Sequence, residues 1–237
     1  MIFSYSRLKL YEECPYKFYL KYILEFKEEN TLPLALGKAV HKAIECRING
    51  DDLEKAVMEG WVEAEFHPEV THEDIADLAS RAKVYTNMGE TEIKFMLPLD
   101  KNNPNSPKIQ GFIDVVVDKG TSFIDWKTNR VMYEVMDNKQ LAIYAWAISQ
   151  IYQKENIQIL GTLYFLRFRK AKTKMFDRLD MEFARLWALG LANEINLKVS
   201  QYNADQQLAN TLFPAKPSNN CKHCPFAREC IKEFCNY

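Results

Sequence analysis

The chain has 237 residues, and hydrophobic residues make up 47% of them, so it can bury the core of one elaborated domain. Its 31 basic and 32 acidic residues give a formal net charge of -1, which excludes the strongly basic composition of many nucleic-acid-binding proteins. Any contact with a nucleic acid must therefore come from local patches.

The first part of the chain is predicted to be helical. Apolar residues recur at helical spacing over residues 4–24, where Pro15 interrupts the pattern, and again over residues 34–48. Residues 51–88 are acidic and lack strand signals, which indicates two or three helices. We therefore take residues 49–90 as a helical insertion before the sheet.

Strand candidates follow this insertion. Three come in succession, and a helix that begins near Asp137 and ends near Tyr152 separates them from a fourth. The strand candidates are residues 92–98, 109–117, 122–127 and 159–168. A long helix over residues 179–199 and a proline-containing segment over residues 203–220 come next. The order of helix, three strands, helix and strand predicts an α/β fold.

A tight hairpin connects the second and third strand candidates, because Lys119 and Gly120 fit a two-residue loop. In that register Asp114 faces Asp125 on one side of the sheet. Directly opposed carboxylates destabilise a sheet, and a divalent cation would remove the conflict. Lys127 points to the same face, where it can reach a bound water or a phosphate oxygen. This pattern is what metal-assisted phosphodiester hydrolysis requires, although an ordinary ion-pair cluster is the alternative.

Four sequence segments together resemble consecutive motifs of the RecB-like nucleases of the PD-(D/E)XK group. They are GFID at 111–114, IDWKT at 124–128, QLAIY at 140–144 and GKAVH at 37–41. The resemblance spans residues 4–230. It implies a restriction-endonuclease-like core with a mixed sheet, a Mg²⁺ or Mn²⁺ cofactor and cleavage of DNA strands.

The resemblance also implies roles for single residues. His41, Asp114 and Asp125 would ligate the metal together with the backbone carbonyl of Trp126, and Lys127 would orient the nucleophilic water. Oxygen ligands suit Mg²⁺, while an imidazole ligand also suits Mn²⁺.

Three further residues lie near these motifs. Gln140 and Tyr144 are four residues apart on a helix, so both can lean over the same edge of the sheet, and the resemblance assigns them substrate positioning. Glu92 begins the first strand and is either a further metal contact or a solvated side chain.

Four of the six cysteines lie near the C-terminus, which in a reducing compartment favours metal ligation over disulfides. Cys221, Cys224 and Cys230 have C-x2-C-x5-C spacing, and Cys14 resembles the distant first cysteine of the AddB nuclease domain and of CRISPR-associated RecB-like exonucleases. The resemblance implies that these four hold a [4Fe-4S] cluster. A zinc site completed by Cys235 or His223 is the alternative, and Cys46 has no assigned role.

A basic run follows the fourth strand candidate. It is either a solvated loop or a track for the phosphate backbone of DNA, because it leaves the sheet near the motif-bearing helix. The run consists of Arg167, Arg169, Lys170, Lys172, Lys174 and Arg178.

These observations predict a single nuclease domain over residues 1–237. Residues 91–168 would form the catalytic sheet and helix, and residues 203–237 together with Cys14 would form the metal-cluster tail. We expect an exonuclease acting on single-stranded DNA ends, with endonuclease activity as a further possibility, in DNA repair, recombination or CRISPR adaptation. The sequence has no phosphate-binding GxxxxGK[ST] loop, so helicase activity would come from a protein partner.

The alternatives are a catalytically silent module that binds DNA ends or serves assembly, and a zinc-stabilised interaction protein. The N-terminal residues carry scattered charges, and no segment reaches the apolar length of a membrane span. We therefore expect a cytoplasmic protein without a membrane partner.

Overall fold

The structure is a computed structural model that describes residues 1–135, 139–153 and 158–235. It divides into two compact units. The first unit comprises Met1–Glu29, Met96–Gln110 and Leu186–Tyr237, and the second comprises Asn30–Phe95 and Gly111–Arg185. The single nuclease domain expected from the sequence stays a prediction.

The second unit contains a mixed sheet, as predicted. Strand β4 pairs antiparallel with β3 and parallel with β5, β6 pairs antiparallel with β5, and β2 also pairs with β3. The bounds are β2 (Glu90–Pro98), β3 (Lys108–Val117), β4 (Ser122–Lys127), β5 (Ile159–Phe165) and β6 (Lys170–Phe176).

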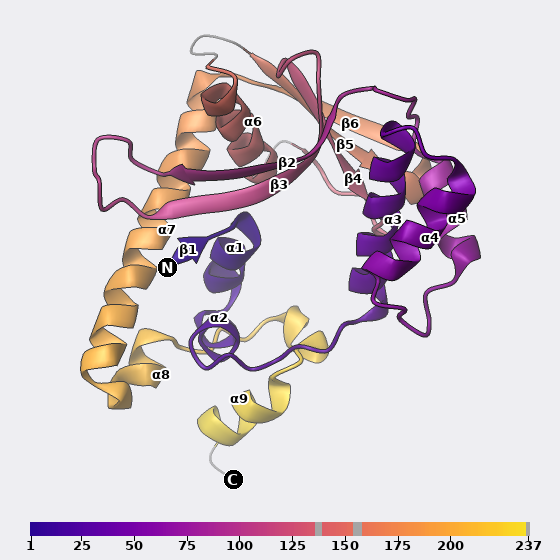
Figure 1. Cartoon of the computed structure of the whole chain (residues 1–237). Coiled ribbons are helices and arrows are strands. Elements are labelled where there is room, and N and C mark those ends of the chain that lie inside the picture. The colour runs from indigo at the N-terminus through magenta and orange to yellow at the C-terminus, as the bar shows by residue number, and fades with distance from the viewer. Residues whose placement is uncertain (136–138, 154–157, 236–237) are drawn as a thin grey trace. The chain divides into compact units, whose positions relative to one another are not determined.

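Helices cover both faces of this sheet. Their bounds are α3 (Leu32–Ile48), α4 (Leu53–Glu63), α5 (His72–Ser80) and α6 (Lys139–Ile151). Strand side chains alternate between faces, so Trp126 packs into the core formed with α3 to α5, whereas Phe123 contacts Tyr144 of α6. Figure 1 shows α6 on one side of β4 and β5 and the other three helices on the opposite side.

The predicted helices before the sheet are confirmed, and residues 51–88 contain two of them. Their first turns are capped by side chains: Asp52 accepts a hydrogen bond from the Lys55 backbone N–H, and Thr71 accepts one from that of Asp74. The predicted start of α6 at Asp137 lies outside the described residues.

The hairpin has the predicted register. Val115 pairs with Ile124 and Val116 with Phe123, and the same register continued by one residue places Asp114 opposite Asp125. The turn itself is longer than the predicted two residues, because the strand pairing ends at Val117 and Ser122 and Asp118, Lys119 and Gly120 all have a positive φ, of 51°, 54° and 84°. A Cβ at Gly120 would also lie 2.8 Å from Tyr152 Cγ, so only glycine fits this turn.

Strand β6 is a correction to the sequence analysis. The fourth strand candidate ends at Phe165 rather than at residue 168, a 3-10 turn (Leu166–Phe168) follows, and Arg169 is left-handed with a φ of 50°. The lysines of the basic run, Lys170, Lys172 and Lys174, then return along β5 in an edge strand instead of a solvated loop, whereas Arg167 lies in the 3-10 turn and Arg178 begins α7. Lysines alternating with other residues suit such an edge, because their charges oppose pairing with another chain.

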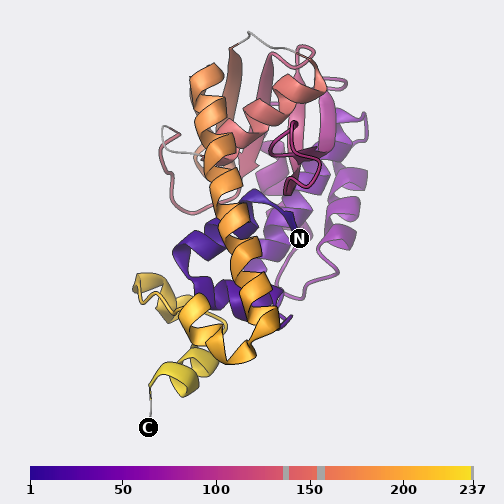
Figure 2. The same cartoon turned by 90° about the vertical axis from the view of Figure 1, so that its left-hand side faces the viewer.

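The first unit is mainly helical. Strand β1 pairs in parallel with the start of β3, and Pro15 opens α2, where its missing N–H costs no helical hydrogen bond. Aromatic rings join the helices, as in the pairs Tyr19–Tyr202 and Phe18–Phe213. Figure 2 shows α1 and α2 beside the part of α7 that belongs to this unit.

Three elements, β2, β3 and α7, have residues in both units. The remaining bounds are β1 (Ile2–Phe3), α1 (Tyr5–Glu13), α2 (Pro15–Tyr22), α7 (Arg178–Ala204), η2 (Gln206–Leu208), α8 (Ala209–Leu212), η3 (Asn219–His223) and α9 (Ala227–Phe234). None of the helices in the described ranges is long and apolar enough to cross a membrane.

Candidate functional site

The second unit brings together the motif residues from four elements. Helix α3 carries His41, β3 carries Asp114, β4 carries Asp125, Trp126 and Lys127, and α6 carries Gln140 and Tyr144. The hairpin sets the two aspartates opposite each other, and the two helices approach from the flanks. Residues separated by up to 103 positions in the chain, from 41 to 144, therefore form one polar cluster in a largely buried setting.

Asp114 is held from two sides. Its Oδ1 lies 3.2 Å from His41 Nδ1, and its Oδ2 accepts a hydrogen bond of 2.7 Å from the Trp126 backbone N–H. Burial acts to raise the pKa of Asp114, but His41 and these hydrogen bonds outweigh it and lower the pKa. Burial likewise opposes a charge on His41, yet Asp114 raises the pKa of His41 to about 9.

Asp125 is almost fully buried, with 2% of its surface exposed. Lys127 Nζ lies 2.6 Å from its Oδ2, but that oxygen accepts no hydrogen bond of ordinary geometry. Burial, together with Asp114, raises the pKa of Asp125. Burial disfavours the charged form of Lys127, and the neighbouring Asp125 carboxylate more than compensates, so the pKa of Lys127 is also raised.

A chain of hydrogen bonds leads from Lys127 to helix α6. Lys127 Nζ donates to Gln140 Oε1 at 3.3 Å, and Gln140 Nε2 donates to the Tyr144 hydroxyl at 2.9 Å. Tyr144 in turn contacts the rings of Phe95 and Phe123. Gln140 and Tyr144 are thus connected to the lysine, and both face the sheet.

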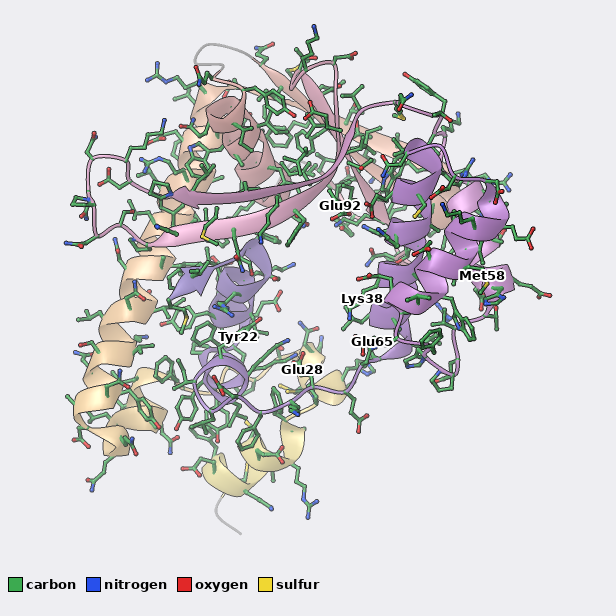
Figure 3. All side chains as sticks on the ribbon, in the orientation of Figure 1. Tyr22, Glu28, Lys38, Met58, Glu65 and Glu92 are labelled. Carbon is green, nitrogen blue, oxygen red and sulfur yellow. The ribbon has the colours of Figure 1, made fainter. Side chains whose placement is uncertain are left out.

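Glu92 belongs to the same cluster. Its backbone is left-handed, with a φ of 48° inside strand β2, a conformation that costs free energy for a residue with a side chain. Figure 3 shows its side chain between β2 and α3. Burial and the Asp114 carboxylate raise the pKa of Glu92 to about 7.

The donor set suits a hard divalent cation. Within the described ranges, no three His, Cys, Asp or Glu side chains are arranged to hold a metal ion. The buried Asp125 Oδ2 has the Lys127 ammonium beside it but accepts no hydrogen bond of ordinary geometry. Carboxylate and carbonyl oxygens, such as those of Asp114, Asp125 and Trp126, are the ligand types that Mg²⁺ and Mn²⁺ prefer. These residues therefore fit such a cation by their chemistry.

Sequence reasoning missed Tyr133, which follows β4. Its ring packs edge-on against Phe165 with centroids 5.2 Å apart, and its hydroxyl shares a hydrogen bond with Lys127. Arg167 donates a hydrogen bond of 2.8 Å to the carbonyl oxygen of Thr128, the residue that follows β4, and so holds the start of the segment from Thr128 to Tyr133. No local pattern identifies Tyr133, because its contacts lie on other strands.

The candidate cluster cysteines lie in the first unit. Cys14 joins α1 to α2, Cys221 lies in η3, Cys224 follows it, and Cys230 lies in α9. Burial raises the pKa of Cys230. The pKa is raised further by four nearby cysteines, which are Cys14, Cys224, Cys221 and Cys235. The six cysteines are unbridged, and Cys46 is buried in the second unit.

Three comparisons relate the chain to known proteins. The sequence model of the PD-(D/E)XK nuclease superfamily matches residues 2–231. The structure of a candidate exonuclease from Eubacterium rectale is 13% identical, with a TM-score of 0.49 over 94% of this chain and 87% of that chain. The structure of the protein SSO0001 is 18% identical, with a TM-score of 0.40 over 95% of this chain and 94% of that chain. No curated protein matches the sequence.

Proposed function

The chain belongs to the PD-(D/E)XK nuclease superfamily, and from this premise we propose that it is a metal-dependent exonuclease that hydrolyses phosphodiester bonds at the ends of single-stranded DNA. The observation that carries the proposal is the buried cluster of Asp114, Asp125 and Lys127 on adjacent strands. Two acids and a lysine held in this way would be costly to bury without a function that uses their charge.

The residues that would hold Mg²⁺ or Mn²⁺ are Asp114, Asp125 and the Trp126 backbone carbonyl, with His41 as a nitrogen ligand. When bound, the cation supplies a water of lowered pKa and stabilises the charge that develops on the phosphate. His41 Nδ1 lies beside the Asp114 carboxylate, so loss of the His41 proton would open a coordination position there.

Lys127 would orient the attacking water or a phosphate oxygen. Its ammonium group is fixed between Asp125 Oδ2 and Gln140 Oε1, which leaves little freedom for the side chain. The Tyr144 hydroxyl accepts from Gln140 and so fixes the amide in turn. This chain of contacts supports a positioning role for Gln140 and Tyr144, because a preorganised donor stabilises developing charge without first reorienting.

The cysteines of the first unit support a second element of the proposal. Cys14, Cys221, Cys224 and Cys230 would hold a [4Fe-4S] cluster, since thiolates are the ligands of such clusters and Cys230 has the other three as electrostatic neighbours. Cys235 is also among those neighbours, so a zinc site that uses it is the competing assignment.

The proposed activity suits several biological settings. A nuclease of single-stranded ends would act in DNA repair, recombination or CRISPR adaptation, with a helicase or recombination protein supplying unwound DNA. A catalytically silent DNA-end-binding or assembly module is the alternative, and both would bind DNA. A cleavage assay therefore distinguishes the nuclease from the silent module, whereas a DNA-binding assay does not.

The test is cleavage of end-labelled linear and closed circular single-stranded DNA with Mg²⁺ or Mn²⁺. We expect the wild type to degrade the linear strand, and Asp125→Ala and Lys127→Ala to abolish this. Lys119→Ala, which removes an exposed lysine from the turn of the same hairpin, is the matched control and should retain activity. A wild type that binds DNA but cuts neither substrate with either cation would favour the silent module.

A further inference from the structure

The sheet register places two lysines of the edge strand on the same face as the candidate site. Asp125 pairs with Leu163, which pairs with Lys172. Lys127 pairs with Phe165, which pairs with Lys170. Paired residues of adjacent strands point to the same face, so these lysines lie two strands from the site residues, about 10 Å away. Lys170 and Lys172 lie about 7 Å apart along β6.

Two other members of the basic run, Arg167 and Lys174, are engaged elsewhere. Lys174 pairs with Asp180 at the start of α7 and lies over the ring of Phe176. Arg167 donates to the Thr128 carbonyl oxygen, so its guanidinium holds a loop. Lys170 and Lys172 are thereby distinguished from Arg167 and Lys174, and Lys172 pairs with the exposed Glu134.

An aromatic ring lies between the lysines and the site. Tyr133 packs against Phe165, the residue that separates Lys127 from Lys170 across the sheet. Phe165 is fully buried beneath it, whereas Tyr133 is 39% exposed and so presents part of its ring to solvent. Exposed aromatic rings between basic side chains are the elements from which proteins build sites for single-stranded nucleic acids.

Resting on the proposed nuclease function, we infer that Tyr133, Lys170 and Lys172 form a binding path for the single strand that leads to Asp125 and Lys127. Tyr133 stacks on an unpaired base, and the two lysines contact phosphates on the side of that base away from the site. A base in a duplex is not available for this stacking, so the path selects single strands.

Glu134 limits the path in the DNA-free protein. Its carboxylate is ion-paired with Lys172 of β6, and its side chain is 76% exposed. Such an exposed pair contributes little stability, so a phosphate can replace the carboxylate. Removal of the Glu134 charge should therefore tighten DNA binding, whereas removal of the lysines should weaken it.

The experiment measures binding of a fluorescent single-stranded oligonucleotide in EDTA, which prevents cleavage. We expect Tyr133→Ala to weaken binding by roughly tenfold, Tyr133→Phe to retain most of it, and Glu134→Gln to tighten it about two- to fivefold. Lys170→Gln with Lys172→Gln should reduce the slope of log K against log salt by about 1.4, and Lys119→Gln should leave it unchanged.

A purely structural role would lower the melting temperature without changing the salt slope, so thermal unfolding of each variant is measured in parallel. The path is wrong if the slope stays at the wild-type value, or if Tyr133→Ala weakens duplex binding as much as single-strand binding. Because the assay needs no catalysis, a wild type that binds through these residues but never cuts would refute only the nuclease activity.

Discussion

Asp114 and Trp126 are joined across β3 and β4 by a hydrogen bond of 2.7 Å, in which the carboxylate accepts from the backbone N–H. The other Asp114 oxygen faces His41, so both oxygens are engaged without a metal. The Trp126 side chain points to the opposite face and is buried in the core with α3 to α5. Trp126 therefore anchors the strand in the core through its side chain and holds the carboxylate of Asp114 through its backbone.

His41 should stabilise the metal-free protein in a defined pH range. The folded pKa of about 9 lies above the ordinary value of 6.5, so its contribution is fully present below pH 6.5 and is lost as the pH rises through 9. We expect His41→Asn to cost roughly 1 to 3 kcal/mol at pH 6 and little above pH 9.5. Denaturant unfolding in EDTA at several pH values measures this, and an equal cost at all pH values would contradict it.

Glu92, in contrast to His41, should destabilise the metal-free protein at neutral pH. Its folded pKa of about 7 exceeds the ordinary 4.5, so the folded state favours the protonated form and loses stability as the pH rises from 4.5 to 7. Glu92→Gln should therefore stabilise the metal-free protein above pH 7, by about 1 to 2 kcal/mol after discounting for its partial exposure, and should be neutral near pH 4.5. Glu63→Gln on the exposed face of α4 serves as the control.

A divalent cation should stabilise the folded protein through the two aspartates. Ligand at about 100 times its dissociation constant adds about 2.7 kcal/mol, which corresponds to a rise in melting temperature of roughly 5 to 10 °C for a chain of this size. We expect this rise for the wild type with Mg²⁺ or Mn²⁺, and its loss in Asp125→Asn. Asp118→Asn, in the exposed turn of the same hairpin, should respond like the wild type, and an unchanged response of Asp125→Asn would show that the charge of Asp125 is not needed to bind the cation.

Tyr144→Phe should affect catalysis rather than binding. The change removes the hydroxyl that accepts from Gln140, so Gln140 and the Lys127 ammonium lose a fixed partner. We expect single-turnover cleavage at saturating DNA to slow by about tenfold, with the affinity for DNA unchanged. A weaker affinity with an unchanged cleavage rate would instead assign Tyr144 to substrate binding.

Replacement of single cysteines should distinguish the two cluster assignments. For a [4Fe-4S] cluster, Cys14→Ser should lower the iron content of anaerobically purified protein from about four atoms per chain, and Cys235→Ser should leave it unchanged. For zinc, the wild type should contain about one zinc and no iron, and Cys235→Ser should release it. Cys46→Ser, a buried thiol outside this cluster, should be silent in both analyses.

The sequence alone determined the hairpin and the helices that precede the sheet. Val116 opposite Phe123, and by the same register Asp114 opposite Asp125, follow from a short turn and from the alternation of strand side chains. Helix α3 follows from apolar residues at helical spacing. These features depend on residues close together in the chain, so the local pattern contains the information that fixes them.

Only the tertiary structure decided which distant residues meet. The family resemblance, but no local pattern, placed His41 beside Asp114, which lies 73 positions away. Nothing in the sequence placed Tyr133 against Phe165, a contact that exists only because β5 returns beside β4. The pairing of β6 with β5 places Lys170, Lys172 and Lys174 on one face of an edge strand. Such contacts depend on burial and strand pairing throughout the whole unit, so a local stretch of sequence does not predict them.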